Sequence, residues 1–272
     1  MKRKFYKYQG AGNDFIVVDA RQQPLNLTRE QVATLCDRRL AIGADGFMAL
    51  EPDPAGAEFF MRYYNADGGE AAMCGNGGRC LALFAHHLGI GGRLKTFHSP
   101  DGMHTAEITE TAGAKGRVRL QMIDVRGYDV YGKGLFLNTG VPHYVEFVQE
   151  LDRVDVSARG GEIRYARQFV PQGGTNVNFV QRLPDGNLRI RTYERGVEGE
   201  TLACGTGATA AAIAANVLYE PERNDFTVQA PGGDLRVVFE VCANRLFKQV
   251  YLEGPAAKVF ECELNLDEIF GG

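Results

Sequence analysis

Two stretches of the chain, AAMCGNGGRCLALFAHHLGI (71–90) and LACGTGATAAAIAANVLYE (202–220), share one pattern, and this pattern decides the fold prediction. Each stretch reads Cys-Gly-polar-Gly and continues with small and apolar residues that favour helix. A glycine-rich turn that opens a helix fits both stretches, and a helix that is apolar on most faces is expected to be buried. The sequence therefore predicts two buried helices, each preceded by a cysteine, Cys74 and Cys204.

The likeness between the two halves continues on both sides of these cysteines. Asn13 and His143, for example, each stand 61 residues before the cysteine of their own half. Five blocks recur in the same order with offsets that match to within one residue, which indicates an internal duplication of one α/β unit. The matched blocks are 10–18 and 139–148, 43–50 and 174–180, 59–74 and 188–204, 71–90 and 202–220, and 99–108 and 230–239.

The predicted domains follow from this duplication. The first copy is expected over residues 1–115 and the second over 117–256, while residues 257–272 form one more strand that could return to the first domain. Strict βαβ alternation is missing, so we expect an α/β (α+β) fold of two pseudo-symmetric domains. Each would be a curled, mostly antiparallel or mixed sheet around a central helix, with the active site in the interdomain cleft. The runs that predict strands are FIVVD, FFMRYY, VRLQMI, HYVEFV, NVNFVQ, LRIRTY, LRVVFEV and KQVYLEG.

Composition argues against several classes of function. The 272 residues carry a net charge of −4, which gives no basic footprint for nucleic acid or an anionic membrane. No window approaches the length of apolar sequence that spans a bilayer, and the N-terminal segment lacks the apolar core of a signal peptide. We therefore expect a cytoplasmic globular protein that acts on a small molecule.

The six cysteines predict free thiols in a reducing compartment. They are sparse in a chain of this size, and the sequence contains neither CxxC nor HExxH, so nothing indicates a disulfide scaffold or a metal site. A cysteine in an apolar setting is usually a small buried hydrophobe, and we interpret four of the cysteines in this way. These four are Cys36, Cys80, Cys242 and Cys262.

Cys74 and Cys204 differ from the other four because each lies in a glycine-flanked turn before a helix, and the duplication repeats that placement. Unpaired N–H groups and the helix dipole at such a position favour thiolate over thiol. Two symmetry-related thiols suit the inversion of a stereocentre, in which one face of a carbon loses a proton and the other face gains one. The helix N-termini could also bind a substrate carboxylate. The pattern predicts a cofactor-independent amino-acid racemase or epimerase.

The same residues strongly resemble the diaminopimelate epimerase family over nearly the whole chain. The matching motifs are GAGNDFIVVD (10–19), NADGGEAAMCGNGGRC (65–80) and YERGVEGETLACGTGA (193–208). The resemblance implies interconversion of LL- and meso-2,6-diaminopimelate without pyridoxal phosphate, any other cofactor or a metal, in lysine and peptidoglycan biosynthesis. It also implies two similar α/β domains with the site between them, and a homodimer.

Residue roles are carried over from the matching motifs. The resemblance makes Cys74 and Cys204 the acid/base pair and places His143 and Glu194 beside them to tune their ionisation. The residues that it places around the substrate are Asn13, Asn65, Gly75, Asn76, Asn176, Glu194, Arg195, Gly205 and Thr206. Val141 and Gly46 depart from the family pattern, in which many members have Asn and some have Gln, respectively; both concern the distal side chain of the substrate.

Four alternatives stay open at this point. Another two-cysteine racemase, of the proline or hydroxyproline type or specific for another amino acid, would share the chemistry, but the proline type resembles MCGH around its first cysteine where this chain has MCGN. A related isomerase branch linked to phenazine synthesis lacks both cysteines. A thiol redox or metal-binding protein would need cysteines close together in the sequence, and a pure interaction module would not need the same Cys-Gly turn twice.

Overall fold

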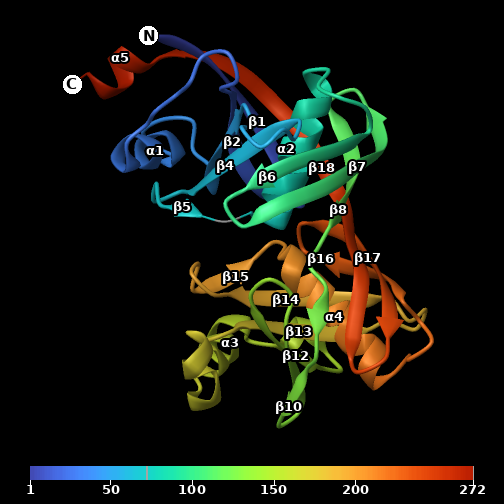
Figure 1. Cartoon of the computed structure of the whole chain (residues 1–272). Coiled ribbons are helices and arrows are strands. Elements are labelled where there is room, and N and C mark those ends of the chain that lie inside the picture. The colour runs from blue at the N-terminus through green and yellow to red at the C-terminus, as the bar shows by residue number, and fades with distance from the viewer. Residues whose placement is uncertain (72, 272) are drawn as a thin grey trace. The chain divides into compact units, whose positions relative to one another are not determined.

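The computed structural model describes residues 1–71 and 73–271. The chain forms two compact units: unit 1 comprises residues 1–120 with 255–272, and unit 2 comprises residues 121–254 (Figure 1). Strands outnumber helices in both units, and the strands pair in both parallel and antiparallel directions. The predicted mixed α/β fold, rich in strands and poor in helices, is confirmed.

Unit 1 is built from hairpins joined by two parallel connections. β1 pairs antiparallel with β2, β2 parallel with β3, β3 antiparallel with β4, and β4 antiparallel with β5 and parallel with β6. β6, β7 and β8 continue as an antiparallel meander, and the end of β18 pairs with β1. The strands are β1 (Lys2–Gly10), β2 (Asn13–Asp19), β3 (Gly46–Glu51), β4 (Phe59–Asn65), β5 (Glu70–Ala71), β6 (Leu94–Ser99), β7 (Gly102–Ala112), β8 (Lys115–Gln121) and β18 (Leu246–Asn265).

Unit 2 repeats this order of pairings. β11 pairs antiparallel with β12, β12 parallel with β13, β13 antiparallel with β14, and β14 antiparallel with β15 and parallel with β16. β16, β17 and the first part of β18 form the antiparallel meander, and the short strands β9 and β10 pair with β18 and β11. The strands are β9 (Val125–Arg126), β10 (Asp129–Tyr131), β11 (Gly134–Asn138), β12 (Pro142–Phe147), β13 (Asn176–Arg182), β14 (Leu188–Glu194), β15 (Gly199–Thr201), β16 (Asp225–Ala230) and β17 (Gly233–Cys242).

The two predicted buried helices are α2 (Gly75–His87) and α4 (Gly205–Leu218). The residues from Asn76 to Ala85 in α2 and almost all residues of α4 up to Asn216 are buried. α2 packs on β1, β2, β3 and β7, while α4 packs on β11 to β14 and on β16 and β17. A helix that is apolar on all sides needs cover on all sides, and the strands of its own unit supply it.

Shorter helices that the sequence analysis did not predict cover the other face of each sheet. α1 (Arg29–Cys36) begins with a capping box between Thr28 and Gln31, and α3 (Val156–Arg164) begins at an Asp155 cap. Both caps are readable in the sequence, but the helices are short and only weakly amphipathic. The remaining helical segments are η1 (Leu151–Arg153), η2 (Arg167–Gln172) and α5 (Leu266–Phe270).

Cover on both faces explains why the central strands are continuously apolar. In β3, Phe47 and Ala49 belong to the core beneath α1, whereas the Met48 side chain lies against the first turn of α2, near Gly77. In β13, Val177 and Phe179 belong to the core beneath α3. Successive side chains on a strand point to opposite faces, so Asn176 and Asn178 project from the other face of β13. This alternation places two asparagines on the α4 side of the sheet in unit 2.

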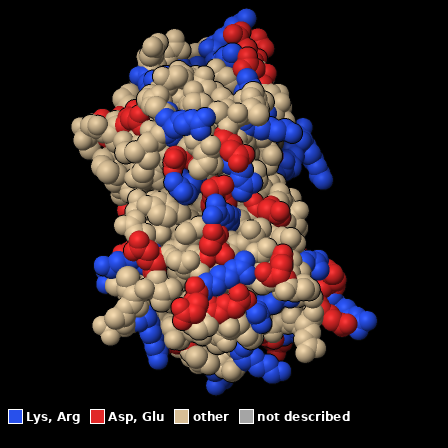
Figure 2. All heavy atoms as spheres, turned by 90° about the vertical axis from the view of Figure 1, so that its right-hand side faces the viewer, with Lys and Arg blue, Asp and Glu red and all other residues tan. Residues whose placement is uncertain are grey.

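Among the described residues, no helix is both long enough and apolar enough to cross a bilayer. On the face drawn in Figure 2, lysine and arginine side chains are interspersed with aspartate and glutamate. Many charged side chains of the protein form ion pairs, as in Arg191 with Glu200 and Arg236 with Asp225.

Candidate functional site

The two cysteines occupy the same place in the two units. Cys74 is the N-cap of α2 and Cys204 is the N-cap of α4, each with extended backbone, so Gly75 and Gly205 are the first helical residues. The carbonyl groups of the cysteines accept the first intrahelical bonds, from Gly78 N at 2.7 Å and Ala208 N at 2.9 Å. The N–H groups in the first turn of a helix point toward its N-terminus, where they can bind an anion.

In unit 2, a threonine hydroxyl connects Cys204 to a buried histidine. The Thr206 Oγ1 atom lies 3.4 Å from Cys204 Sγ and 2.9 Å from His143 Nε2. Thr206 is held in turn, since its carbonyl oxygen accepts a hydrogen bond from Thr139 Oγ1 at 2.9 Å. The structure therefore links His143 to Cys204 through the Thr206 hydroxyl.

His143 is neutral in the folded protein. Its side chain is fully buried, and this burial, together with the positive charge of Arg195, lowers the imidazole pKa to about 3. A neutral imidazole carries one N–H and one lone pair, so it can donate at one ring nitrogen and accept at the other.

Asn178, which the sequence analysis did not single out, holds the far side of this imidazole. Its Nδ2 atom lies 3.1 Å from His143 Nδ1 and 3.0 Å from the carbonyl oxygen of Tyr144. Its Oδ1 atom accepts a hydrogen bond from Thr192 Oγ1 at 3.0 Å. Asn178 and Thr192 are both buried, so unit 2 contains a polar chain that runs from the sheet to Cys204. The N-V-N alternation at 176–178 was the available sequence signal.

In unit 1, an asparagine pair takes the place of the threonine and histidine. The Oδ1 atom of Asn13 lies 3.8 Å from Cys74 Sγ and accepts a hydrogen bond from Asn76 Nδ2 at 3.3 Å. Both asparagines were predicted site residues, and the structure brings them together at the thiol. The group that faces Cys74 is thus an amide oxygen, whereas the group that faces Cys204 is a hydroxyl.

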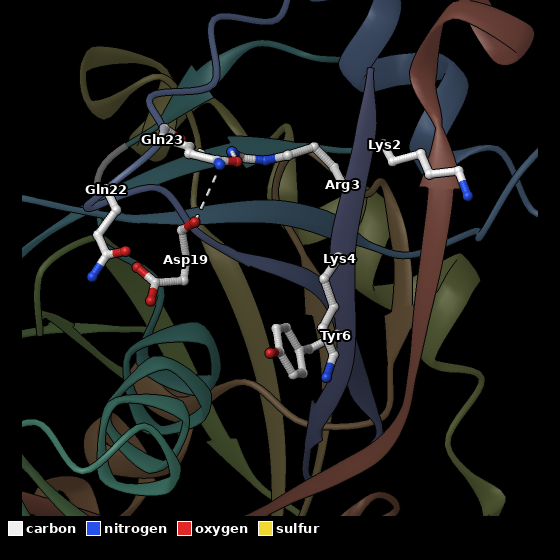
Figure 3. A pocket seen from close by; sticks show the side chains of 7 residues that line it. All are labelled: Lys2, Arg3, Lys4, Tyr6, Asp19, Gln22 and Gln23. Carbon is white, nitrogen blue, oxygen red and sulfur yellow. Dashed lines mark hydrogen bonds between the residues drawn. The ribbon is translucent and has the colours of Figure 1, made fainter.

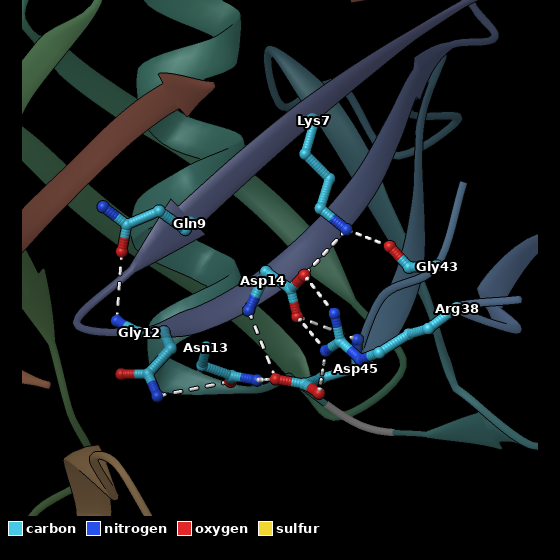
Figure 4. Close-up of polar contacts among 9 residues, drawn as sticks. Lys7, Gln9, Gly12, Asn13, Asp14, Arg38, Gly43 and Asp45 are labelled. Atoms are coloured by element: carbon cyan, nitrogen blue, oxygen red, sulfur yellow. Dashed lines mark hydrogen bonds and ion pairs between the residues drawn. The ribbon is translucent and has the colours of Figure 1, made fainter. Parts of the chain in front are cut away.

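An ion network fixes the orientation of Asn13 (Figure 4). Asn13 Nδ2 donates to Asp45 Oδ2 at 2.7 Å, and Arg38 joins Asp45 to Asp14 with contacts of 2.8 and 2.6 Å. Lys7, which is almost fully buried, pairs with Asp14 at 2.7 Å and also donates to the Gly43 carbonyl. These cations hold the pKa of Asp14 well below its usual range despite its burial. Since a carboxylate can only accept, the Asn13 amide must turn its oxygen toward Cys74.

Arg79 donates hydrogen bonds to the first turn of α2 from inside the core. This fully buried guanidinium donates to Asn76 Oδ1 at 2.7 Å and to the Gly75 carbonyl at 3.2 Å. Among the described residues, no carboxylate pairs with it, and its Nε atom has no hydrogen-bond partner. Burial lowers the pKa of Arg79, while the nearby sulfurs of Cys80 and Cys74 act in the opposite direction. A buried cation beside Cys74 is a second feature that sequence analysis missed.

The other predicted site residues lie at or directly beside the ends of strands. Asn65 ends β4 and is exposed, whereas Asn176 is buried and binds backbone, with Nδ2 to the Pro142 carbonyl at 3.0 Å and Oδ1 to Arg195 N at 2.8 Å. The Glu194 carboxylate accepts from Thr201 Oγ1 at 2.8 Å. The Arg195 guanidinium donates to the Gln172 carbonyl at 3.0 Å. Asn176 therefore holds the backbone of Arg195 in place.

The strand registers correct one detail of the predicted duplication. His143 pairs with Asn176 in the β12–β13 ladder, and Phe15 pairs with Gly46 in the β2–β3 ladder. By register, the counterpart of His143 is therefore Phe15 and not Asn13, although Asn13 has the matching offset in sequence. The counterpart of Asn178 is Met48, two residues further along the partner strand. The buried polar pair of unit 2 thus corresponds to a buried apolar pair in unit 1.

In the described parts of the chain, neither the remaining cysteines nor the basic end of β1 lies in a network of polar contacts like those beside Cys74 and Cys204. Burial raises the pKa of the Cys80 and Cys36 thiols, and among the described residues no cluster of His, Cys, Asp and Glu could hold a metal. A pocket of about 210 Å³ near the N-terminus contains none of the predicted site residues. Figure 3 shows Arg3 within it, already bonded to Gln23 at 2.7 Å and to the Asp19 carbonyl at 3.3 Å.

Relatives in sequence share one description. The family model for diaminopimelate epimerase matches residues 5–125 and 135–259. The diaminopimelate epimerase of Flavobacterium psychrophilum is 46% identical, with 95% of this chain and 98% of that protein covered. The one from Chlorobaculum tepidum is 43% identical, with 94% and 99% covered.

Solved structures of lower identity share the fold. A phenazine biosynthesis protein of the PhzF family from Bacillus anthracis superposes with a TM-score of 0.77 at 15% identity, covering 97% of this chain and 99% of that one. A probable proline racemase from Agrobacterium radiobacter gives 0.69 at 17% identity, covering 97% and 93%. This fold hosts several chemistries, so the fold alone does not select one. The family model and the close relatives do select one, and this chain belongs to the diaminopimelate epimerase family.

Proposed function

We propose that this chain interconverts LL- and meso-2,6-diaminopimelate by a two-base mechanism in which Cys74 and Cys204 exchange protons with the α-carbon. Epimerisation of this amino acid is the activity of the family to which the chain belongs. The observation that carries the mechanism is that both cysteines are N-caps of buried helices, each beside a different polar partner. We further propose that the two units are copies of one ancestral unit. On resemblance alone, we also propose a cytoplasmic homodimer.

The proposed reaction moves one proton off the α-carbon and another onto it. A thiolate on one side takes the α-proton and becomes a thiol, and the electron pair left on the carbon delocalises into the carboxylate. The thiol on the opposite side then protonates the carbon and becomes a thiolate. In the reverse direction the two cysteines exchange roles, so each must be able to act as acid and as base.

The helix ends are proposed to stabilise the charge that develops on the substrate carboxylate. The amides of Gly75 and Asn76 and those of Gly205 and Thr206 lie in the first turns of α2 and α4. Donors at helix N-termini stabilise such an anion without reorganising during the reaction. Asn13, Asn65, Asn176, Glu194 and Arg195 are proposed to orient the rest of the substrate, and His143 and Glu194 to tune the thiols.

Turnover of LL-diaminopimelate in deuterated water by the reduced enzyme, without added cofactor, tests this proposal. Solvent deuterium is expected at the inverted α-carbon, and Cys74→Ser and Cys204→Ser are each expected to reduce turnover by several orders of magnitude. Cys262→Ser and Cys242→Ser, half-buried positions on β18 and β17, are the matched controls and should keep full activity. Full activity of either Cys74→Ser or Cys204→Ser would refute the two-base mechanism. Parallel assays with proline and hydroxyproline test the racemase alternative.

A further inference from the structure

We infer that Asn178 is a positioning residue: it fixes His143 as the tautomer protonated at Nε2, so that the Thr206 hydroxyl is turned to donate to Cys204 Sγ. The inference rests on the proposed role of Cys204 in the reaction. It concerns unit 2 alone and assigns a hydrogen-bond direction to each link between the sheet and the sulfur.

The orientation of the Asn178 amide is the first step. The Tyr144 carbonyl oxygen, 3.0 Å from Nδ2, can only accept, so the nitrogen of the amide must face it. Thr192 Oγ1, 3.0 Å from Oδ1, supplies the complementary donor. An amide flip would place two oxygens together in a buried site, which is costly. The second N–H of Asn178 therefore points to His143 Nδ1, 3.1 Å away.

The tautomer of His143 is the second step. Because Nδ1 accepts the Asn178 N–H, it carries the lone pair of the neutral ring. The single ring proton is then on Nε2, which donates to Thr206 Oγ1 at 2.9 Å. The oxygen of Thr206 receives this bond, so its own proton is free to point to Cys204 Sγ at 3.4 Å. A donor aimed at the sulfur stabilises the thiolate over the thiol.

The comparison between units supports a specific function rather than general packing. The register counterparts of His143 and Asn178 in unit 1 are Phe15 and Met48, which are both fully buried. An apolar pair therefore fills this place in the sheet without difficulty. Buried polar groups cost stability unless they are paired, so a polar pair that is retained only beneath Cys204 indicates a role there.

Nitrogen-15 NMR of the histidines in the intact wild-type protein tests the first half of this inference. His143, assigned by its loss in a His143→Gln variant, should show a protonated Nε2 and an unprotonated Nδ1 at neutral pH. Asn178→Asp replaces the donor with a carboxylate oxygen and should place a proton on Nδ1. A wild-type His143 protonated at Nδ1 would overturn the assignment, whether or not any variant folds.

Alkylation of Cys204 by iodoacetamide as a function of pH, followed by peptide mass spectrometry, tests the second half. Thr206→Val should lower the thiolate fraction of Cys204 about tenfold below its pKa, which corresponds to the loss of one charge-assisted hydrogen bond. Asn178→Leu should lower it several-fold, and the double variant should match Thr206→Val because both act through one hydroxyl. Met48→Leu, the matched position in unit 1, should leave Cys204 unchanged.

Independence of the two substitutions, or a wild-type alkylation profile for Cys204 in Asn178→Leu, would refute the relay. These readouts do not depend on turnover. If Cys204→Ser kept full activity, the proposed two-base function would fail while the tautomer and ionisation measurements could still hold. Conversely, if Cys204→Ser lost turnover while wild-type His143 were protonated at Nδ1, the proposed function would hold and the proposed hydrogen-bond relay would be wrong.

Discussion

Replacement of Gly207 by alanine should destabilise unit 2 far more than the equivalent replacement of Gly77 destabilises unit 1. A Cβ atom at 207 would lie only 2.4 Å from Asn178 Oδ1 and 3.3 Å from Cys204 Cβ. At the equivalent Gly77, the nearest atom would be Met48 Sδ at 3.1 Å, the flexible end of an unbranched side chain. The two glycines share the Cys-Gly-polar-Gly motif, but Gly207 faces a hydrogen-bonded amide whereas Gly77 faces a flexible apolar side chain.

The magnitude follows from what each neighbour can do. Asn178 cannot move away without weakening its bonds to Tyr144, His143 and Thr192. Overpacking costs about 1–3 kcal/mol and each buried hydrogen bond about 1 kcal/mol, so Gly207→Ala should cost about 3 kcal/mol. At Gly77, a small displacement of Met48 is offset by the better helix propensity of alanine, up to about 1 kcal/mol, so the net change should be near zero.

Urea unfolding followed by far-ultraviolet circular dichroism measures this difference, and amide hydrogen exchange of α2 and α4 assigns it to a unit. The Gly207→Ala/Asn178→Ala double variant, in which the clashing oxygen is absent, should be less destabilised than the sum of the two single variants. The reasoning fails if the two glycine variants have unfolding free energies within about 1 kcal/mol of each other, or if the double variant is strictly additive.

Three further predictions concern the surroundings of the two thiols. The folded pKa of His143, about 3, lies below its unfolded value of about 6.5, so the free energy of unfolding falls as the pH drops below about 6.5. In urea titrations, the wild-type protein should lose about 2 kcal/mol of unfolding free energy from this residue between pH 7 and pH 5, and the His143→Gln variant should lose correspondingly less. Asp45→Ala removes the acceptor that orients Asn13 and should lower kcat/KM about tenfold in the deuterium assay. The control Glu107→Ala removes one partner of an exposed ion pair in the same unit and should leave kcat/KM unchanged. Equal activity of the two variants would contradict the proposed role of Asp45 in orienting Asn13. Arg79→Met should change the unfolding free energy by no more than about 1 kcal/mol, because the buried cation has no carboxylate partner among the described residues. The same variant should reduce kcat at least tenfold, because Asn76 loses the hydrogen bond from Arg79. A stable variant with full kcat would show that Arg79 has no role in the site.

Much of the architecture was readable from local sequence patterns. The two apolar helices and their cysteine N-caps appear where the sequence predicts them, and each predicted strand run overlaps a strand, although VRLQMI (118–123) continues beyond the end of β8 at Gln121. Local rules suffice for these elements because capping and hydrophobic periodicity involve residues within about one turn or a few positions of each other. The helices α1 and α3 were missed because each is short, although their caps at Thr28 and Asp155 follow the ordinary rules.

By itself, the sequence determined the family, the position of both N-cap cysteines and the prediction that each unit presents one of them. Only the tertiary structure decided what faces each sulfur. The bond from Asn178 to His143 spans 35 residues and the bond from His143 to Thr206 spans 63, so both depend on the parallel register of β12 and β13 and on how α4 packs against them. A shift of one residue would turn Asn178 to the opposite face of the sheet, because side chains alternate along a strand. That alternation, together with burial in a close-packed core, gives Cys204 different polar neighbours from those of Cys74 although the two occupy the same place in their units.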